Sequence, residues 1–233
     1  MTQDSLAPPR LTLFGHFSMT LGGTTLTQFS YDKVKALWVY LLLNGQAVNR
    51  AGLAEMLWPD QGLSSGRTNL RHALHCLRQS LGDEADRALS VSRQSIELHC
   101  GDHWQLDVRR LEALLQGPVD IAIVDELLSL YRGDLVEELH LPQCGEFQRW
   151  LLKTRSEWRQ RVIAYIEQAL GTADVVSDQV LRQLVSRFSG YGPFHERRVR
   201  QLAEQGQSAA AHEEFNAYLE LLALSGQQPE PEF

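Results

Sequence analysis

Apolar and polar residues alternate along the beginning of the chain. The period is two over residues 11–21 and again over 24–26, which is typical of strands with one buried face, and Gly22-Gly23 favours a turn between them. From Tyr31 the apolar residues recur at helical spacing, and this pattern stops at Gly45. The start of the chain is therefore predicted to form a small sheet followed by a helix.

Two more helices are predicted next. Asn49 can cap a short helix that ends before Pro59, because proline cannot continue a helix. Either Ser64 or Ser65 can cap a longer helix, which Gly82 terminates.

The alternation returns over residues 89–98, around a polar centre at Arg93-Gln94. This pattern indicates a β-hairpin with Arg93 at its tip. Strands, three helices and a hairpin, in that order, are the elements of a winged helix with an additional N-terminal sheet.

The second half of the chain has no strand pattern beyond Leu106. Helices are expected over residues 108–116, 119–131, 142–170, 176–189, 194–205 and 208–224. The last two are joined at Gln205–Gln207 and resemble a tetratricopeptide unit. The prediction is a mostly α protein with a small β component: a winged-helix domain over residues 10–105 and an all-helical, tetratricopeptide-like domain over 106–230.

Charge is unevenly distributed between these two parts. Residues 1–105 have nine Lys/Arg and nine Asp/Glu, so the whole net charge of −7 lies in residues 106–233. A neutral domain can bind DNA when its cations share one face. No apolar run is long enough for a membrane span, and the three cysteines lack metal-type spacing, so we expect a cytoplasmic protein with reduced thiols and no membrane partner.

The helix over residues 64–81 has the pattern of a DNA-reading helix. No Asp or Glu occurs from Gln61 to Gly82, and one narrow stripe of leucines is apolar. One flank of the stripe is basic: Arg67, Arg71, Arg78 and, just beyond, His75. Shorter polar residues lie opposite the leucines or beside them: Thr68, Asn69, His72 and Gln79. We expect these residues to contact the major groove and Arg93 to enter a minor groove, the alternative being an ordinary solvated amphipathic helix.

Other chemistry is less well supported by the pattern. Gly62–Gly66 matches the G-x-S-x-G nucleophile elbow with Ser64 as nucleophile, but that motif needs a preceding strand, and a helix is predicted there. His72, His75 and Cys76 provide too few ligands for a tetrahedral metal site, and no phosphate-binding P-loop occurs. We therefore expect no enzyme activity, metal or cofactor, with a serine hydrolase as the alternative that Ser64 would support.

Two further groups of residues have ordinary explanations. The five tryptophans occur in helical, apolar settings and are expected in cores rather than as base-stacking platforms. Arg197, Arg198 and Arg200 are expected to form one solvated face, the alternative being a docking site for an acidic partner.

Several segments together resemble one family of bacterial regulators. In the predicted winged helix these segments are Lys35–Asn44, Val48–Asp60 and Arg67–Arg71 with Leu77-Arg78 and Leu81-Gly82. In the predicted helical domain they are Leu130–Leu135, the helix with Glu146 and Trp150, and Gly226–Glu232. This set resembles the antibiotic regulatory protein (SARP) family, with an OmpR-type winged helix and a bacterial transcriptional activation domain, over about residues 10–232.

The resemblance implies a function as well as a fold. It implies that Arg67, Asn69, Arg71, His75 and Arg78 lie on the recognition helix and Arg93 in the wing. It also implies an activator that binds double-stranded DNA as a side-by-side homodimer and recruits RNA polymerase or another regulatory protein.

The chain departs from the family at two places. The family's wing usually has a Gly-Tyr near the turn, where this chain has Gln94-Ser95-Ile96, and residues 173–191 match the family's helical repeats loosely. An interaction scaffold with weak or lost DNA binding is therefore the alternative function. The Pro-x-Pro ending before Phe233 suggests the N-terminal part of a longer regulator or a minimal member.

Overall fold

The computed structural model describes residues 7–173 and 175–225. It divides into two compact units, Met1–Gly117 with Gly133–Ile163, and Pro118–Arg132 with Ala164–Phe233. The domain boundary predicted between residues 105 and 106 separates two functions and not two compact units. It stays a prediction.

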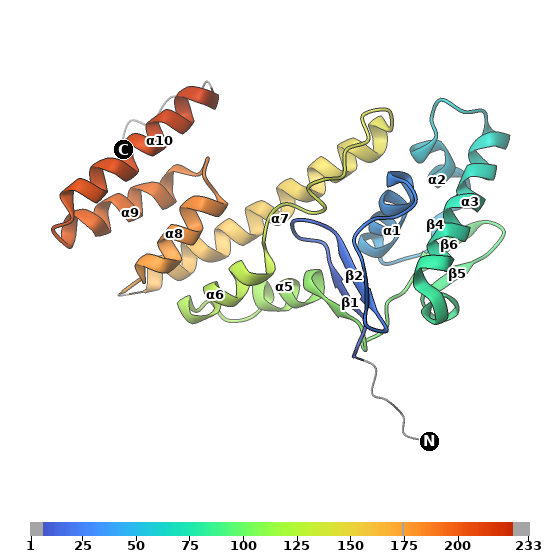
Figure 1. Cartoon of the computed structure of the whole chain (residues 1–233), viewed down its shortest axis with the longest axis horizontal. Coiled ribbons are helices and arrows are strands. Elements are labelled where there is room, and N and C mark those ends of the chain that lie inside the picture. Colours follow the sequence, from blue (N-terminus) through green and yellow to red (C-terminus); the bar gives the residue numbers. More distant parts are fainter. Residues whose placement is uncertain (1–6, 174, 226–233) are drawn as a thin grey trace, which may run out of the picture. The chain divides into compact units, whose positions relative to one another are not determined.

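The first unit begins with a four-stranded sheet in the order β3-β2-β1-β7. Figure 1 labels its strands β1 and β2. Its strands are β1 (Arg10–Thr12), β2 (Ser18–Leu21), β3 (Thr24–Leu26) and β7 (Gln105–Leu106). The first three pair antiparallel, with Gly15 at a φ of 82° between β1 and β2, and Gly22 and Gly23 at φ of 53° and 79° between β2 and β3. Strand β7 pairs with β1 in parallel. Leu11 of β1 and its cross-strand partner Met19 of β2 are each 1% exposed, but Thr12 is also buried, so β1 lacks the alternation of exposed and buried residues that the period of two predicts.

The predicted winged helix follows the N-terminal sheet. Its elements are α1 (Asp32–Asn44), β4 (Val48–Asn49), α2 (Arg50–Leu57), α3 (Leu63–Leu81), the short η1 (Gly82–Glu84) and α4 (Ala85–Ala88), β5 (Leu89–Val91) and β6 (Ser95–Leu98). The wing is a three-stranded sheet in the order β4-β6-β5. The side chains of Leu70, Leu74, Leu77 and Leu81 in α3 are at most 4% exposed, so the predicted apolar stripe faces the core.

The predicted serine cap of α3 is wrong. The helix begins at Leu63, its N-cap residue is Gly62, and no side chain caps it. Ser64 and Ser65 therefore lie inside the first turn, where the carbonyl of Ser64 accepts a hydrogen bond from the Thr68 hydroxyl at 3.1 Å. Glycine is an acceptable N-cap residue, which removes the need for a serine there. The element before this turn is α2, so Ser64 does not follow a strand.

A segment from beyond the winged helix completes the first unit. The amide of Val136 donates to the Leu13 carbonyl at 2.7 Å, and the amide of Glu137 donates to the Gly15 carbonyl at 3.0 Å. The guanidinium of Arg155 in turn donates to three carbonyls of this segment, including that of Leu135 at 2.8 Å. The N-terminal sheet is thereby tied to residues more than 100 positions later in the sequence.

The remaining elements of the described chain are helices. They are α5 (Asp107–Gln116), α6 (Ile121–Leu130), α7 (Gly145–Thr172), α8 (Asp178–Arg187), α9 (Gly192–Glu204) and α10 (Ser208–Ser225). The six predicted helices are confirmed, with ends that differ by a few residues. Gly206, at a φ of 76°, makes the tight turn between α9 and α10.

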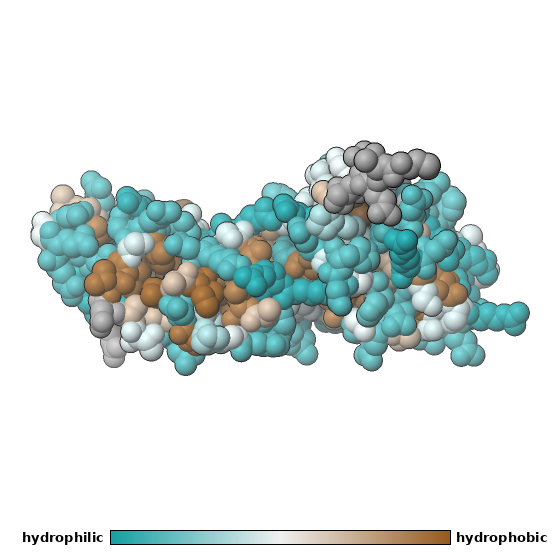
Figure 2. Space-filling view, turned by 90° about the horizontal axis from the view of Figure 1, so that it is seen from below, coloured by the Kyte–Doolittle hydropathy of each residue, from teal (hydrophilic) through white to brown (hydrophobic). Residues whose placement is uncertain are grey.

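The second unit has a core of aromatic side chains. The rings of Tyr131 and Phe188 stack 5.6 Å apart, and Phe194 packs edge-on against Phe188. The predicted arginine face is partly used within this unit, because Arg198 pairs with Glu214. On the face shown in Figure 2, apolar residues gather over this unit. None of the described helices is long and apolar enough to cross a membrane.

Candidate nucleic-acid interface

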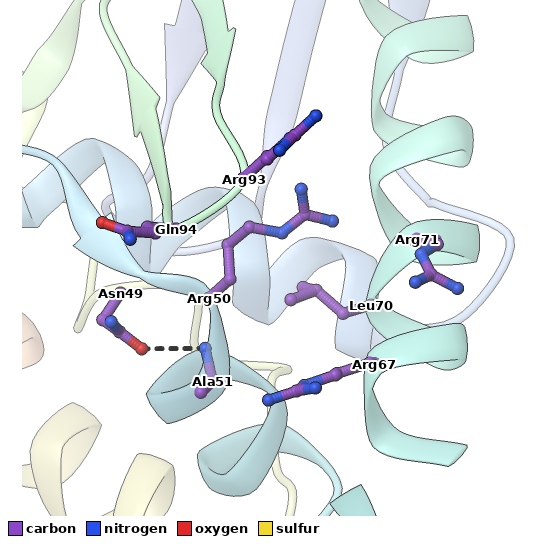
Figure 3. Close-up of a pocket in the computed structure, with 8 residues that line it drawn as sticks. All are labelled: Asn49, Arg50, Ala51, Arg67, Leu70, Arg71, Arg93 and Gln94. Carbon is purple, nitrogen blue, oxygen red and sulfur yellow. Dashed lines mark hydrogen bonds between the residues drawn. The ribbon is translucent and has the colours of Figure 1, made fainter. Parts of the chain in front are cut away.

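The start of α2, one flank of α3 and the tip of the wing enclose a hollow of about 410 Å³ (Figure 3). It is lined by Asn49, Arg50, Ala51, Arg67, Leu70, Arg71, Arg93 and Gln94. Four of these eight residues are arginines and none is acidic, so the hollow is strongly positive. Such a surface favours an anionic ligand.

The helix α3 supplies two of the four arginines. Leu70 is 1% exposed and packs into the core, which places its neighbours Arg67 and Arg71 on an exposed flank, one turn apart. Neither guanidinium has a hydrogen bond or ion pair among the described residues. Their charges are therefore available to a ligand.

The tip of the wing is an ordered turn between Ser92 and Ser95. The Ser92 hydroxyl accepts hydrogen bonds from the amides of Gln94 at 3.1 Å and Ser95 at 2.9 Å, and the Ser92 amide donates to the Ser95 carbonyl at 2.9 Å. Arg93 lies within this turn, exposed and without a partner in the described part of the chain. The hydrogen bonds of this turn therefore fix the backbone from which the Arg93 side chain extends.

The start of α2 closes the hollow from a third side. The side chain of Asn49 accepts hydrogen bonds from the amides of Ala51 at 2.9 Å and Gly52 at 3.2 Å, so the predicted cap is confirmed. Arg50 follows it, and its guanidinium donates to the Ser92 carbonyl at 2.8 Å. Arg50 could not be predicted as a site residue, because its partner Ser92 is 42 residues away and no local sequence pattern connects the two.

Three of the nine predicted site residues line the hollow: Arg67, Arg71 and Arg93. The other six lie elsewhere on α3: Thr68, Asn69, His72, His75, Arg78 and Gln79. His75 and Arg78 are exposed, and the amide of Asn69 donates to the side chain of Gln61. Gln79 lines a separate hollow between α3 and strands β2 and β3.

His72 packs against the start of α1 instead of the arginine hollow. Its ring stacks on Tyr31 with centroids 5.9 Å apart, and its Nδ1 lies 3.3 Å from the Tyr31 hydroxyl. Burial, with a smaller effect from the charge of Cys76, raises the pKa of Tyr31 to about 12, so the hydroxyl stays protonated at neutral pH. Tyr31 therefore occupies one side of the His72 ring.

The described residues contain no group of three or more His, Cys, Asp or Glu side chains placed to hold a metal ion. The three cysteines are free and buried, and burial raises the pKa of Cys100 to about 11. A thiol with so high a pKa is a poor nucleophile.

No protein-family model and no curated protein sequence matches the chain. Among solved structures, Mycobacterium tuberculosis EmbR in complex with a low-affinity phosphopeptide is similar, with a TM-score of 0.61 and 20% sequence identity. The similarity covers 96% of this chain and 62% of that chain, so this chain spans less than two thirds of its neighbour. At this identity the comparison shows a shared fold, in which a winged helix with an additional N-terminal sheet precedes an all-helical part.

Proposed function

We propose that the chain is a transcriptional regulator of the SARP type that binds double-stranded DNA in a sequence-specific manner. The observation on which this rests is that arginines from α3 and the wing, which have no partner among the described residues, converge in one hollow with no acidic residue in its lining. The two elements are those with which winged helices bind DNA: a helix in the major groove and a hairpin beside it. The shared fold with EmbR supports the same proposal.

In this proposal α3 enters the major groove with its leucine stripe against the protein core. Arg67 and Arg71 neutralise backbone phosphates or donate to the O6 and N7 atoms of guanine. Arg93 approaches the adjacent minor groove, whose narrow A·T stretches attract arginine. The remaining predicted residues of α3 make further contacts with phosphates and bases: Thr68, Asn69, His72, His75, Arg78 and Gln79.

The helical part has the partner-binding role in this proposal. We assign residues 10–105 to an OmpR-type DNA-binding domain and 106–230 to a tetratricopeptide-like activation domain. The apolar residues that gather over the second unit are suited to a protein partner (Figure 2). RNA polymerase, another regulatory protein and a second copy of the chain on DNA are the partners proposed, in the cytoplasm and without enzymatic chemistry.

The proposal is tested by selecting duplexes from a randomised DNA library and measuring the affinity of the enriched duplex by fluorescence anisotropy. Affinity should fall steeply with salt, since each phosphate contact releases counterions. Replacing Arg67, Arg71 or Arg93 by alanine should weaken binding. Where the arginine contacts a phosphate, the replacement should also reduce the slope of log affinity against log salt concentration by about 1 in magnitude.

Arg87→Ala is the matched control, because Arg87 is an exposed arginine of the same unit that pairs with Glu84 at 3.2 Å and does not line the hollow. If the three variants of the hollow bind as tightly as this control, the proposed interface is wrong.

The charge distribution favours one other function, an interaction scaffold in which the winged helix no longer binds DNA. All the net negative charge lies in residues 106–233, so the helical part is suited to basic protein surfaces. Absence of binding to any duplex at low salt, together with a stable protein partner, would support this function over the first.

A further inference from the structure

The wing is joined to α2 through a short third strand. In β4 the residues Val48 and Asn49 pair with Ile96 and Ser95 of β6. Arg50, the next residue, extends this connection, because its amide donates to the Gln94 carbonyl at 2.9 Å and its guanidinium donates to the Ser92 carbonyl at 2.8 Å. Arg50 thus binds the residues on both sides of Arg93, and Figure 3 shows it extending from the start of α2 to the wing tip.

The helix from which Arg50 extends is itself fixed against α3. Leu53 and Leu57 of α2 are at most 1% exposed, and Asn49 caps the first turn. Leu70 of α3, which lines the same hollow as Arg50, is also 1% exposed. Arg50 therefore connects the wing tip to the same packed pair of helices that presents Arg67 and Arg71.

The hydrogen bonds inside the Ser92–Ser95 turn fix its local shape but not its position over α3. The pairing of β4 with β6 holds the wing at Ser95 and Ile96, and the side chain of Ile96 is buried, but these contacts stop short of Ser92 and Arg93 at the tip. The contacts of Arg50 supply a connection from the turn to the helices, and a hydrogen bond from a charged donor is stronger than one between neutral groups.

Building on the proposed DNA-binding function, we propose that Arg50 is a positioning residue, which holds the wing tip so that Arg93 joins Arg67 and Arg71 in one DNA-binding hollow. Arg50 acts through Arg93. The competing role for Arg50 is a phosphate contact of its own, made with the N–H groups that Ser92 does not use.

A double-mutant cycle separates these two roles. We compare the DNA affinities of Arg50→Gln, Arg93→Ala and the double variant with that of the parent chain. Each single variant should weaken binding about tenfold, the scale of one lost arginine contact, and the double variant should be little weaker than Arg93→Ala alone. Losses that multiply in the double variant would overturn the proposal, since Arg50 would then bind DNA independently.

Hydrogen–deuterium exchange of the chain without DNA gives a second measurement. The peptide that covers residues 89–98 should exchange faster in Arg50→Gln than in the parent, while Arg87→Gln, the control, should leave it unchanged. Unchanged exchange in Arg50→Gln overturns the positioning role, whatever the DNA affinities are. Faster exchange in a protein that binds no duplex would refute the proposed DNA-binding function and leave the structural connection in place.

Discussion

Lys35 lies in the first turn of α1 with its side chain 4% exposed, and its ammonium is 2.6 Å from the carboxylate of Glu138. Glu138 also accepts a hydrogen bond from the amide of Phe17 at 3.2 Å. The Glu138→Gln substitution keeps the shape of the side chain and an oxygen for both donors, but it leaves the buried ammonium without a countercharge. We expect this substitution to destabilise the first unit.

The size of the effect follows from the burial of the two partners. Removing one partner of a fully buried ion pair costs about 3–5 kcal/mol. The side chain of Glu138 is 28% exposed, so water stabilises part of the charge of the pair. Because glutamine also retains an acceptor for Lys35, we expect a smaller loss, about 2 kcal/mol at pH 7.

The pKa of Glu138 determines how the stability difference between the parent and Glu138→Gln changes with pH. Burial acts to raise the pKa of Glu138, but the hydrogen bonds from Lys35 and from the backbone outweigh it and hold the pKa below its ordinary value. A carboxyl with a lowered pKa stabilises the folded state above its unfolded pKa, about 4.3, and this contribution is lost as the pH falls through the folded pKa. The stability difference between the parent and Glu138→Gln should therefore be complete near neutral pH and disappear in acid.

Urea denaturation followed by tryptophan fluorescence between pH 3 and pH 7 measures this difference. Glu157→Gln is the matched control, because Glu157 and Lys153 are both more than half exposed and 3.7 Å apart, and such surface pairs contribute little. Equal stabilities of the parent and Glu138→Gln at pH 7, or a difference that persists unchanged in acid, would refute the reasoning.

Three other substitutions test the local structure of the first unit by the same denaturation assay. Asn49→Ala removes the cap of α2 and should cost about 1 kcal/mol; a stability equal to that of the parent would contradict the cap. Gly45→Ala places a side chain at a φ of 63° and should destabilise by about 1 kcal/mol, although no atom lies close enough to clash. Leu77→Ala empties a position that is 0% exposed and should cost about 2–5 kcal/mol, whereas Arg78→Ala, its exposed neighbour, should leave stability nearly unchanged.

Local sequence patterns were sufficient for most of the helices and for the hairpin. The end of α1 could be predicted because Gly45 adopts a left-handed conformation that glycine allows without strain. The hairpin could be predicted because both of its strands alternate around a polar turn. The start of α3 could not be placed correctly, since serine and glycine are both good N-cap residues and three of them occur within four positions.

The strands β4 and β7 could not be predicted from local patterns. Each has two residues, which is too short to show any period, and each exists because a distant strand provides its hydrogen bonds. The same limit applies to the candidate site. A helical wheel places Arg67 and Arg71 on one flank of α3, but only the pairing of β4 with the wing brings Arg50 to Ser92.

The pair of Lys35 and Glu138 has a consequence for the way the chain can be divided. A fragment that ends at residue 105 would keep every helix and strand of the winged helix and would lose Leu106 of β7 from the N-terminal sheet. It would nevertheless leave the buried ammonium of Lys35 without Glu138. It would also lack the amides of Val136 and Glu137 that bind the carbonyls of Leu13 and Gly15. The local patterns that predict the winged helix thus stop short of the residues that stabilise it, because stability depends on contacts between parts of the chain far apart in sequence. Residues 133–163, which include the start of α7, are therefore also needed for a stable winged helix.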